Sequence, residues 1–191
     1  MPSIATRVSP EEYLERERQA ETRSEYRNGE IVAMSGASIR HGRITGNLVF
    51  RIRSALKNSS CEVFSTDLRL AVRAANLFTY PDVMVICGEP EVADDRQDIV
   101  LNPVVLIEVL SKSTRVYDRG KKFASYRMIP SLREYLTVAQ NKIHIEQHTR
   151  QADQSWVAKE FTEPGGTIKL ESIAVELRVA DIYEKVTIAP D

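Results

Sequence analysis

Two acidic residues stand inside otherwise apolar stretches of the sequence, and they are the first candidates for chemistry. Glu108 interrupts the run VVLIEVLS at residues 104–111, and Asp82 follows a proline in YPDVMV at residues 80–85. A buried carboxylate without a partner costs several kcal/mol, roughly, so each acid must meet a cation. If the two strands are neighbours, both carboxylates can share one end of a sheet. Two hard oxygen ligands and a backbone carbonyl suit Mg²⁺, which polarises a phosphate and activates water.

The segments before these acids are predicted to form a helix, a hairpin and a second helix. The serine, proline and two glutamates of SPEE at residues 9–12 start a helix that runs to about residue 19. Asn28-Gly29 is a hairpin turn signal, with strands expected near residues 23–27 and 30–35. A helix over residues 38–57 is indicated by an apolar stripe with His41 at its end, made of Ile44, Leu48, Ile52 and Leu56.

The segments around and after the two acids are predicted to be rich in strands. The pattern indicates strands at residues 62–73 and 79–86 joined by a connection at 74–78, then a polar acidic loop at 88–102 and an apolar strand at 103–110. A helix is expected to start at residues 111–113 and to run to about Met128, followed by a strand at 134–139. A hairpin at 143–149 and 156–161 and a helix near 179–185 complete the chain. The strand at residues 103–110 is the most apolar, which places it at the centre of the sheet. Pro130 stops the helix before it.

This order of elements predicts an α/β fold, with an α+β mixed sheet that carries helices on its faces. The core order is α-β-β-β-α-β, preceded by the helix and hairpin and followed by a β-hairpin extension. The sequence contains no repeat, no low-complexity segment and no linker that would divide it. We therefore expect residues 1–191 to form one domain.

The charges are segregated along the chain, although the net charge is only −1. No acid occurs between Ile31 and Cys61, where the five basic residues are Arg40, Arg43, Arg51, Arg53 and Lys57. Between Ser111 and Arg133 there are seven basic residues and one acid, Asp118. Such segregation can create a local positive field suited to nucleic acid, or it can simply mark solvated helix faces.

Nothing in the sequence indicates export or a membrane. The chain has no apolar N-terminal stretch with a basic flank, and its longest apolar runs are far shorter than a membrane span. Cys61 and Cys87 lack the paired spacing of a metal site. A cytoplasmic setting with reduced cysteines is the expectation.

The chain resembles the Uma-type restriction endonuclease family, which is common in cyanobacteria and belongs to the PD-(D/E)XK nuclease superfamily. The motifs that carry the resemblance, in order, are Asn28-Gly29-Glu30, His41, Tyr80-Pro81-Asp82-Val83, Ile107-Glu108-Val109-Leu110-Ser111, Asp118 through Lys122 to Tyr126, and Glu134-Tyr135-Leu136. They extend over almost the whole chain, and their combination is more specific than any one of them. The resemblance implies a restriction-endonuclease-like core.

The resemblance also implies the site residues. Asp82 and Glu108 would bind a divalent metal, with the carbonyl of Val109 as a third ligand. The superfamily places a lysine two residues after the glutamate, but that position holds Leu110. In this family the lysine is expected on the following helix, which points to Lys122.

The spacing of residues on the predicted helix supports Lys122 as the lysine of the site but does not exclude Lys121. Asp118 lies one turn before Lys122 and Tyr126 one turn after it, so the three share a helix face. Lys121 remains a competitor, and Lys122 could instead simply bridge Asp118. His41 and Glu30 are expected to lie near the site in supporting roles.

The function implied by the resemblance is hydrolysis of DNA phosphodiester bonds by an endonuclease that depends on Mg²⁺ or Mn²⁺. The products would be a 5′-phosphate and a 3′-hydroxyl, and a homodimer is expected because two-fold symmetry suits two antiparallel strands. DNA is the expected partner. One alternative is an inactive nuclease fold that binds nucleic acid or a protein. Another treats Asp82 and Glu108 as structural ion-pair members in an oligomer core.

Overall fold

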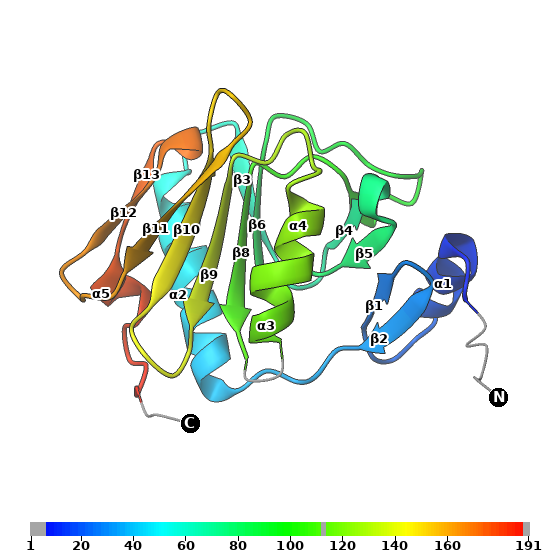
Figure 1. The fold of residues 1–191 in the computed structure, drawn as a ribbon, viewed down its shortest axis with the longest axis horizontal. Helices are drawn as coiled ribbons and strands as arrows, with labels where there is room; N and C mark the ends of the chain where they lie inside the picture. The colour runs from blue at the N-terminus through cyan, green and yellow to red at the C-terminus, as the bar shows by residue number, and fades with distance from the viewer. Residues whose placement is uncertain (1–6, 112–113, 189–191) are drawn as a thin grey trace.

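A six-stranded mixed sheet forms the centre of the protein, and helices cover both of its faces (Figure 1). The structure is a computed structural model that describes residues 7–111 and 114–188. The sheet has the order β11-β10-β9-β8-β6-β3, in which β8 is parallel to β9 and antiparallel to β6. Its strands are β3 Cys61–Ser65, β6 Val83–Cys87, β8 Val105–Leu110, β9 Glu134–Ala139, β10 Ile145–Arg150 and β11 Trp156–Phe161. The fold class and the central place of the strand that holds Glu108 are as predicted.

One face of the central sheet packs against α2, the long helix at Ile39–Ala55. Ser38 caps the start of α2 by accepting a hydrogen bond from the backbone N–H of His41. Ile44 and Leu48 are fully buried and belong to the same core cluster as Ile107 of β8. The helix predicted at residues 38–57 is therefore confirmed, together with its inward stripe.

The opposite face of the sheet is covered by a helical segment that is not one regular helix. It consists of α3 at Arg115–Tyr117, a π-helical turn at Asp118–Lys122, and α4 at Phe123–Tyr126. Its predicted start at residues 111–113 includes two residues, 112 and 113, that lie outside the described ranges. The π-helical turn was not predicted, because an extra residue in one turn leaves no clear mark on the sequence pattern.

A second sheet of five strands lies beside the first, in the order β2-β1-β5-β4-β7. Its strands are β1 Ser24–Arg27, β2 Glu30–Ala33, β4 Arg69–Val72, β5 Leu77–Thr79 and β7 Ile99–Val100, with a 3₁₀ turn η1 at Arg73–Ala75. The predicted hairpin around Asn28-Gly29 is the β1–β2 pair. The predicted first helix is α1 at Pro10–Glu17, which lies next to this hairpin (Figure 1).

Two strands predicted as continuous are each divided between the two sheets. The segment at residues 62–73 splits into β3 and β4, and the segment at 79–86 splits into β5 and β6. Thr66 breaks the first with a φ of 34°, and Pro81, which has no backbone N–H, breaks the second. The chain thus leaves the central sheet after β3 and re-enters it at β6, directly after Asp82.

The C-terminal part adds the predicted β10–β11 hairpin and a further hairpin that was not predicted. The latter pairs β12 Thr167–Leu170 with β13 Val175–Arg178, joined by the 3₁₀ turn η3 at Glu171–Ile173. The short helix α5 at Val179–Ile182 follows, as expected, and contributes to the core beside α2. Among the described residues, no helix is both long and apolar enough to cross a membrane.

The two cysteines form a disulfide, contrary to the expected reduced state. Cys61 of β3 and Cys87 of β6 are directly opposite each other in the antiparallel ladder, at the end of the strands away from Asp82. The separation of 26 residues gave no sign of this pairing, because only the register between β3 and β6 brings the two side chains together.

Candidate active site

Asp82 and Glu108 come from neighbouring strands and lie at the same end of the sheet. The last paired residues of β6 and β8 are Val83 and Ile107, and the same antiparallel register carried one step further places Asp82 opposite Glu108. Asp82 is fixed there because its Oδ2 accepts a 2.7 Å hydrogen bond from the backbone N–H of Val109. The structure therefore brings the two predicted acids together.

Lys122 reaches this pair from the helical segment that follows β8. Its Nζ lies 2.9 Å from Oε1 of Glu108, 3.0 Å from Oε1 of Glu25 and 3.6 Å from Oδ1 of Asp118. All four side chains are 5 % exposed or less. Lys121, the competing lysine, is exposed.

Two tyrosines, on the side of the sheet that Lys122 occupies, hold Glu108 and the π-helical turn in place. The hydroxyl of Tyr126 donates a 2.7 Å hydrogen bond to Oε1 of Glu108, the oxygen that also contacts Lys122. The hydroxyl of Tyr135 donates to the backbone carbonyl of Asp118 at 3.0 Å. These bonds anchor the π-helical turn against β8 and β9, and π-helical turns occur frequently at functional sites.

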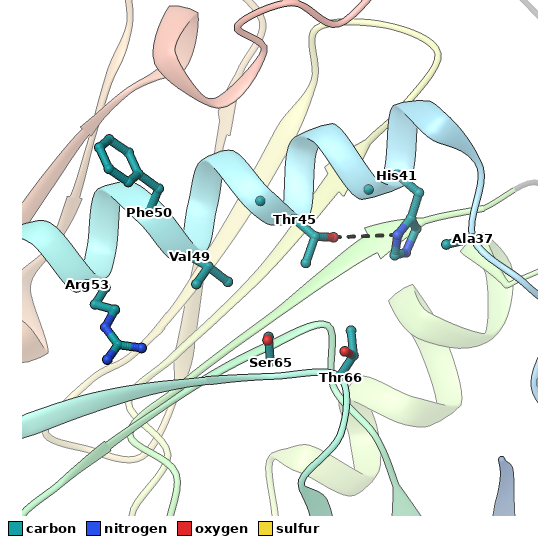
Figure 2. Close-up of a pocket in the computed structure, with 10 residues that line it drawn as sticks. Ala37, His41, Thr45, Val49, Phe50, Arg53, Ser65 and Thr66 are labelled. Atoms are coloured by element: carbon teal, nitrogen blue, oxygen red, sulfur yellow. Dashed lines mark hydrogen bonds between the residues drawn. The ribbon is translucent and has the colours of Figure 1, made fainter.

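His41 approaches from the opposite face of the sheet, at the start of α2. Its Nε2 lies 3.2 Å from Oδ1 of Asp82, and its Nδ1 lies 3.5 Å from the hydroxyl of Thr45 (Figure 2). Burial disfavours the charged imidazole, but the hydrogen bond and charge of Asp82 outweigh it and raise the pKa of His41. His41 thus orients the carboxylate of Asp82.

Glu25, which the sequence did not single out, is the fourth carboxylate of the charged cluster around Lys122, with Asp82, Glu108 and Asp118. It lies on β1 and accepts hydrogen bonds from Thr79 of β5 and from Arg27. Glu30, the predicted supporting acid, is exposed on β2, where it is paired in register with Arg27. Both acids flank the same turn, and only the packing of the hairpin decides which one faces Lys122.

The cluster contains more carboxyl groups than cations, and burial of Glu108 disfavours the ionisation of this carboxyl. Burial raises the pKa of Glu108 to about 8; Asp82 and Asp118 add to the effect, and Lys122 opposes it. Burial likewise raises the pKa of Asp118 above its usual range. Four carboxylates, those of Asp82, Glu108, Asp118 and Glu25, thus share the cations Lys122 and Arg27 and the imidazole of His41.

Glu25 and Lys122 of the cluster stay charged. Burial acts to raise the pKa of Glu25, but Lys122, Thr79 and Arg27 outweigh it and lower this pKa to about 2. Burial also disfavours the charged form of Lys122, yet Glu108, Glu25 and Asp118 hold the pKa of its ammonium well above the usual value. The lysine is therefore a permanent cation at neutral pH.

The donor set suits a hard cation, but side chains alone do not complete it. Within the described ranges, no three side chains of the types His, Cys, Asp and Glu are grouped so that they could hold a metal ion. Asp82 and Glu108 are candidates for two oxygen ligands, and the excess of carboxyl groups over cations in the cluster is the observation that fits an added divalent cation. The backbone of Val109, which already meets Asp82 through its N–H, is the third candidate.

Comparison with known proteins identifies relatives of this chain along nearly its full length. The family model described as "Uma2: Putative restriction endonuclease" matches residues 10–181. Two proteins of Synechocystis sp. strain PCC 6803 are similar. "Uncharacterized protein sll1609" is 37% identical over 164 residues, or 86% of this chain and 93% of the relative. "Uncharacterized protein slr1290" is 34% identical over 177 residues, or 93% of this chain and 92% of the relative.

A solved structure shares the fold. It is described as the crystal structure of "a putative nuclease belonging to DUF820" from Anabaena variabilis, and it matches with a TM-score of 0.79. The match covers 94% of this chain and 99% of that chain, at 19% sequence identity. At this identity the likeness shows the fold, and the restriction-endonuclease-like architecture expected from the sequence is confirmed.

Proposed function

The chain belongs to the Uma2 restriction endonuclease family, and from this premise we propose that it is a divalent-metal-dependent nuclease that hydrolyses phosphodiester bonds in DNA. The observation that carries the proposal is the contact of 2.9 Å between Lys122 and Glu108, with Asp82 at the adjoining end of the sheet. A lysine beside an acidic pair suits hydrolysis of a phosphodiester, because the acids can hold a cation and the lysine can place water.

Asp82 and Glu108 are the proposed ligands of Mg²⁺ or Mn²⁺, with the carbonyl of Val109 as the third. Lys122 and Tyr126 both contact Oε1 of Glu108, and Oε2 takes neither contact. When bound, the metal ion polarises the phosphate and lowers the pKa of a bound water. Binding would also require Glu108 to lose its proton, because a metal ligand must be the carboxylate form.

Lys122 replaces, from the helical segment, the lysine that the superfamily carries at the position of Leu110. Its ammonium remains charged, so it can orient the attacking water and stabilise charge that develops on the phosphate. His41 positions Asp82 through the 3.2 Å contact. Glu25 and Asp118 keep the ammonium in place, so we assign them positioning roles.

The experiment is cleavage of supercoiled plasmid and of circular single-stranded DNA with Mg²⁺, Mn²⁺ or EDTA. Cleavage should require a metal ion and fall at least about 100-fold in Asp82→Asn, Glu108→Gln and Lys122→Met. Glu89→Gln, an exposed acid in a loop, is the matched control. Glu25→Gln should reduce cleavage more than Glu30→Gln. Intact DNA across a range of salt, or full cleavage by the Asp82 and Glu108 variants, would contradict the proposal.

A second candidate is a nuclease fold that binds DNA or a protein without cutting. It is favoured by one observation: Lys122 and Tyr126 already satisfy one oxygen of Glu108, so the cluster holds together without a metal. Calorimetric titration with Mg²⁺ separates the two candidates. No heat of binding from a folded protein supports the inactive fold, and binding that disappears in Asp82→Asn supports the nuclease.

A further inference from the structure

A groove of about 580 Å³ runs along the outer side of α2, beside the candidate active site. Figure 2 shows His41 at one end of it and Phe50 and Arg53 at the other, with Ser65 and Thr66 of the β3–β4 turn facing the helix. The near end is continuous with the site, because His41 contacts Asp82. The two ends are twelve residues apart on one helix, which corresponds to about 18 Å.

The groove is open because the helix carries glycines where it faces solvent. Gly42 and Gly46 both line it, and apart from the adjoining residues and backbone of α2 itself, no heavy atom of the described residues lies within 4 Å of a Cβ built at either position. Glycine weakens a helix interior, and packing does not require it at these two positions. Side chains here would fill the groove, so the glycines keep it wide.

The far end of the groove combines an exposed aromatic ring with positive charge. Phe50 is 64% exposed, although large aromatic side chains are usually buried. Arg53 also lines this end of the groove, with its guanidinium on the other side of the helix from the Phe50 ring (Figure 2), and Lys57 follows one turn later in the sequence. No acid occurs between residues 31 and 61, and the nearby Asp67 is paired with Arg23.

We propose that this groove holds one strand of DNA with unpaired bases, which stack on Phe50 while Arg53 contacts the phosphates. The inference rests on the proposed nuclease function and names its substrate class. A duplex presents phosphates outward and offers no base faces to a largely apolar lining, whereas an unpaired strand offers both bases and phosphates. No acid occurs within α2, and Asp181 and Glu184 beside it are paired with Arg51, so the charge along the helix suits a polyanion rather than a basic peptide.

The test is binding of a fluorescent thymidine 12-mer, followed by anisotropy in EDTA so that no cleavage occurs. Phe50→Ala should weaken binding about 5- to 100-fold, without changing the dependence on salt. Arg53→Gln should lower the slope of log affinity against log salt by about 0.7, the value for one phosphate contact to a single strand. These two signatures separate stacking from charge.

Gly46→Leu is a variant that we expect to fold as the parent does. A Cβ at position 46 meets no neighbouring side chain within 4 Å, so the leucine side chain starts in open space and extends into the groove, and leucine favours the helix more than glycine does. Its melting temperature should therefore be no lower than that of the parent, while oligonucleotide binding is lost. Val157→Ala and Arg96→Gln, exposed residues away from the groove, are the matched controls and should bind as the parent does.

Several results would overturn the inference. Equal binding by Phe50→Ala, Arg53→Gln and Gly46→Leu would exclude the groove, and a blunt duplex bound as tightly as the 12-mer would exclude the unpaired strand. A change in oligomeric state of Phe50→Ala with unaltered binding would assign the groove to a second copy of the chain. Cleavage with Mg²⁺ is measured separately from binding. Binding without cleavage would refute only the nuclease proposal. Cleavage by the groove variants at the parental rate would refute only the role of the groove.

Discussion

Replacing Lys122 with methionine tests whether the charge of this lysine stabilises the buried carboxylates of the cluster in the folded state. The substitution keeps an apolar stem of similar length and removes the ammonium. Glu108, Glu25 and Asp118, at 2.9, 3.0 and 3.6 Å from that ammonium, then lose a shared partner while they remain buried. We expect Lys122→Met to lower the free energy of unfolding of the metal-free protein strongly at pH 8.

The expected loss is about 3–5 kcal/mol, the usual cost of removing one partner from a buried ion pair. Each short contact is worth about 5 kcal/mol before desolvation, at an effective dielectric constant of about 20. Desolvation of the ammonium, several kcal/mol, no longer opposes folding in the variant, so the net value is smaller than the sum of contacts.

The loss should shrink as the pH falls. Burial raises the pKa of Glu108 and of Asp118 above the unfolded values, and in the variant Lys122 no longer opposes this. Groups with a raised pKa destabilise the fold only as the pH rises above the unfolded pKa. Each unit of pH below 8 reduces the cost of protonating one carboxyl by about 1.4 kcal/mol. Near pH 5 the loss should be smaller than at pH 8; what remains there is the stabilisation of the Glu25 carboxylate by Lys122, which is lost only as the pH falls from the unfolded pKa of Glu25 toward its folded value of about 2.

The assay is urea unfolding in EDTA from pH 5 to pH 8, followed by the fluorescence of Trp156, the single tryptophan. Lys121→Met, an exposed neighbour, is the control and should stay within about 0.5 kcal/mol of the parent. Adding Glu108→Gln to Lys122→Met should recover part of the loss. If Lys122→Met is as stable as Lys121→Met at pH 8, or if its loss does not depend on pH, the electrostatic account of the cluster is wrong.

Three further predictions concern other contacts. Glu108→Gln alone should leave the free energy of unfolding at pH 7 in EDTA at or above the parental value, because burial already raises the pKa of this carboxyl to about 8; a large loss would indicate a purely structural ion pair. Arg18→Ala should cost about 1 kcal/mol at pH 7, because Arg18 contacts the partly exposed Asp94 and Asp98. Arg18 lowers the pKa of Asp98, so this stabilisation is present above the unfolded pKa and should be lost as the pH falls through the lowered pKa of Asp98. A difference that stays undiminished in acid would contradict this. Reduction of the Cys61–Cys87 disulfide, which spans 26 residues, should lower the free energy of unfolding by about 3 kcal/mol, and the double serine variant should show no response to reductant.

Local sequence patterns predicted most of the elements and the acidic pair. The stripe of α2, the turn at Asn28-Gly29 and the apolar run of β8 are short-range signals, and each produced the expected element. Glu108 was found because a carboxylate inside an apolar strand contradicts the pattern around it. The hairpin β12–β13 and the breaks within the two long predicted strands were missed, because a short alternating segment does not reveal which sheet it joins.

The members of the cluster could not all be predicted, because they meet through long-range contacts. Glu25 and Glu30 flank one turn and have the same chemistry, and only the docking of the hairpin selects Glu25 for Lys122. Lys121 and Lys122 are adjacent, and the π-helical turn together with the bond of Tyr135 to Asp118 decides which lysine is buried. The pairing of Cys61 with Cys87 depends in the same way on strand register.

The sequence by itself determined the types of residue available for chemistry and the helices and strands that carry them, because these follow from short-range periodicity and turn signals. The tertiary structure decided which of those residues share a site, what charge they hold there, and that a groove runs from the site along α2. The physical reason is that burial and mutual distance set the pKa of Glu108 and the contacts of Lys122, and both arise only when strands and helices distant in sequence pack together.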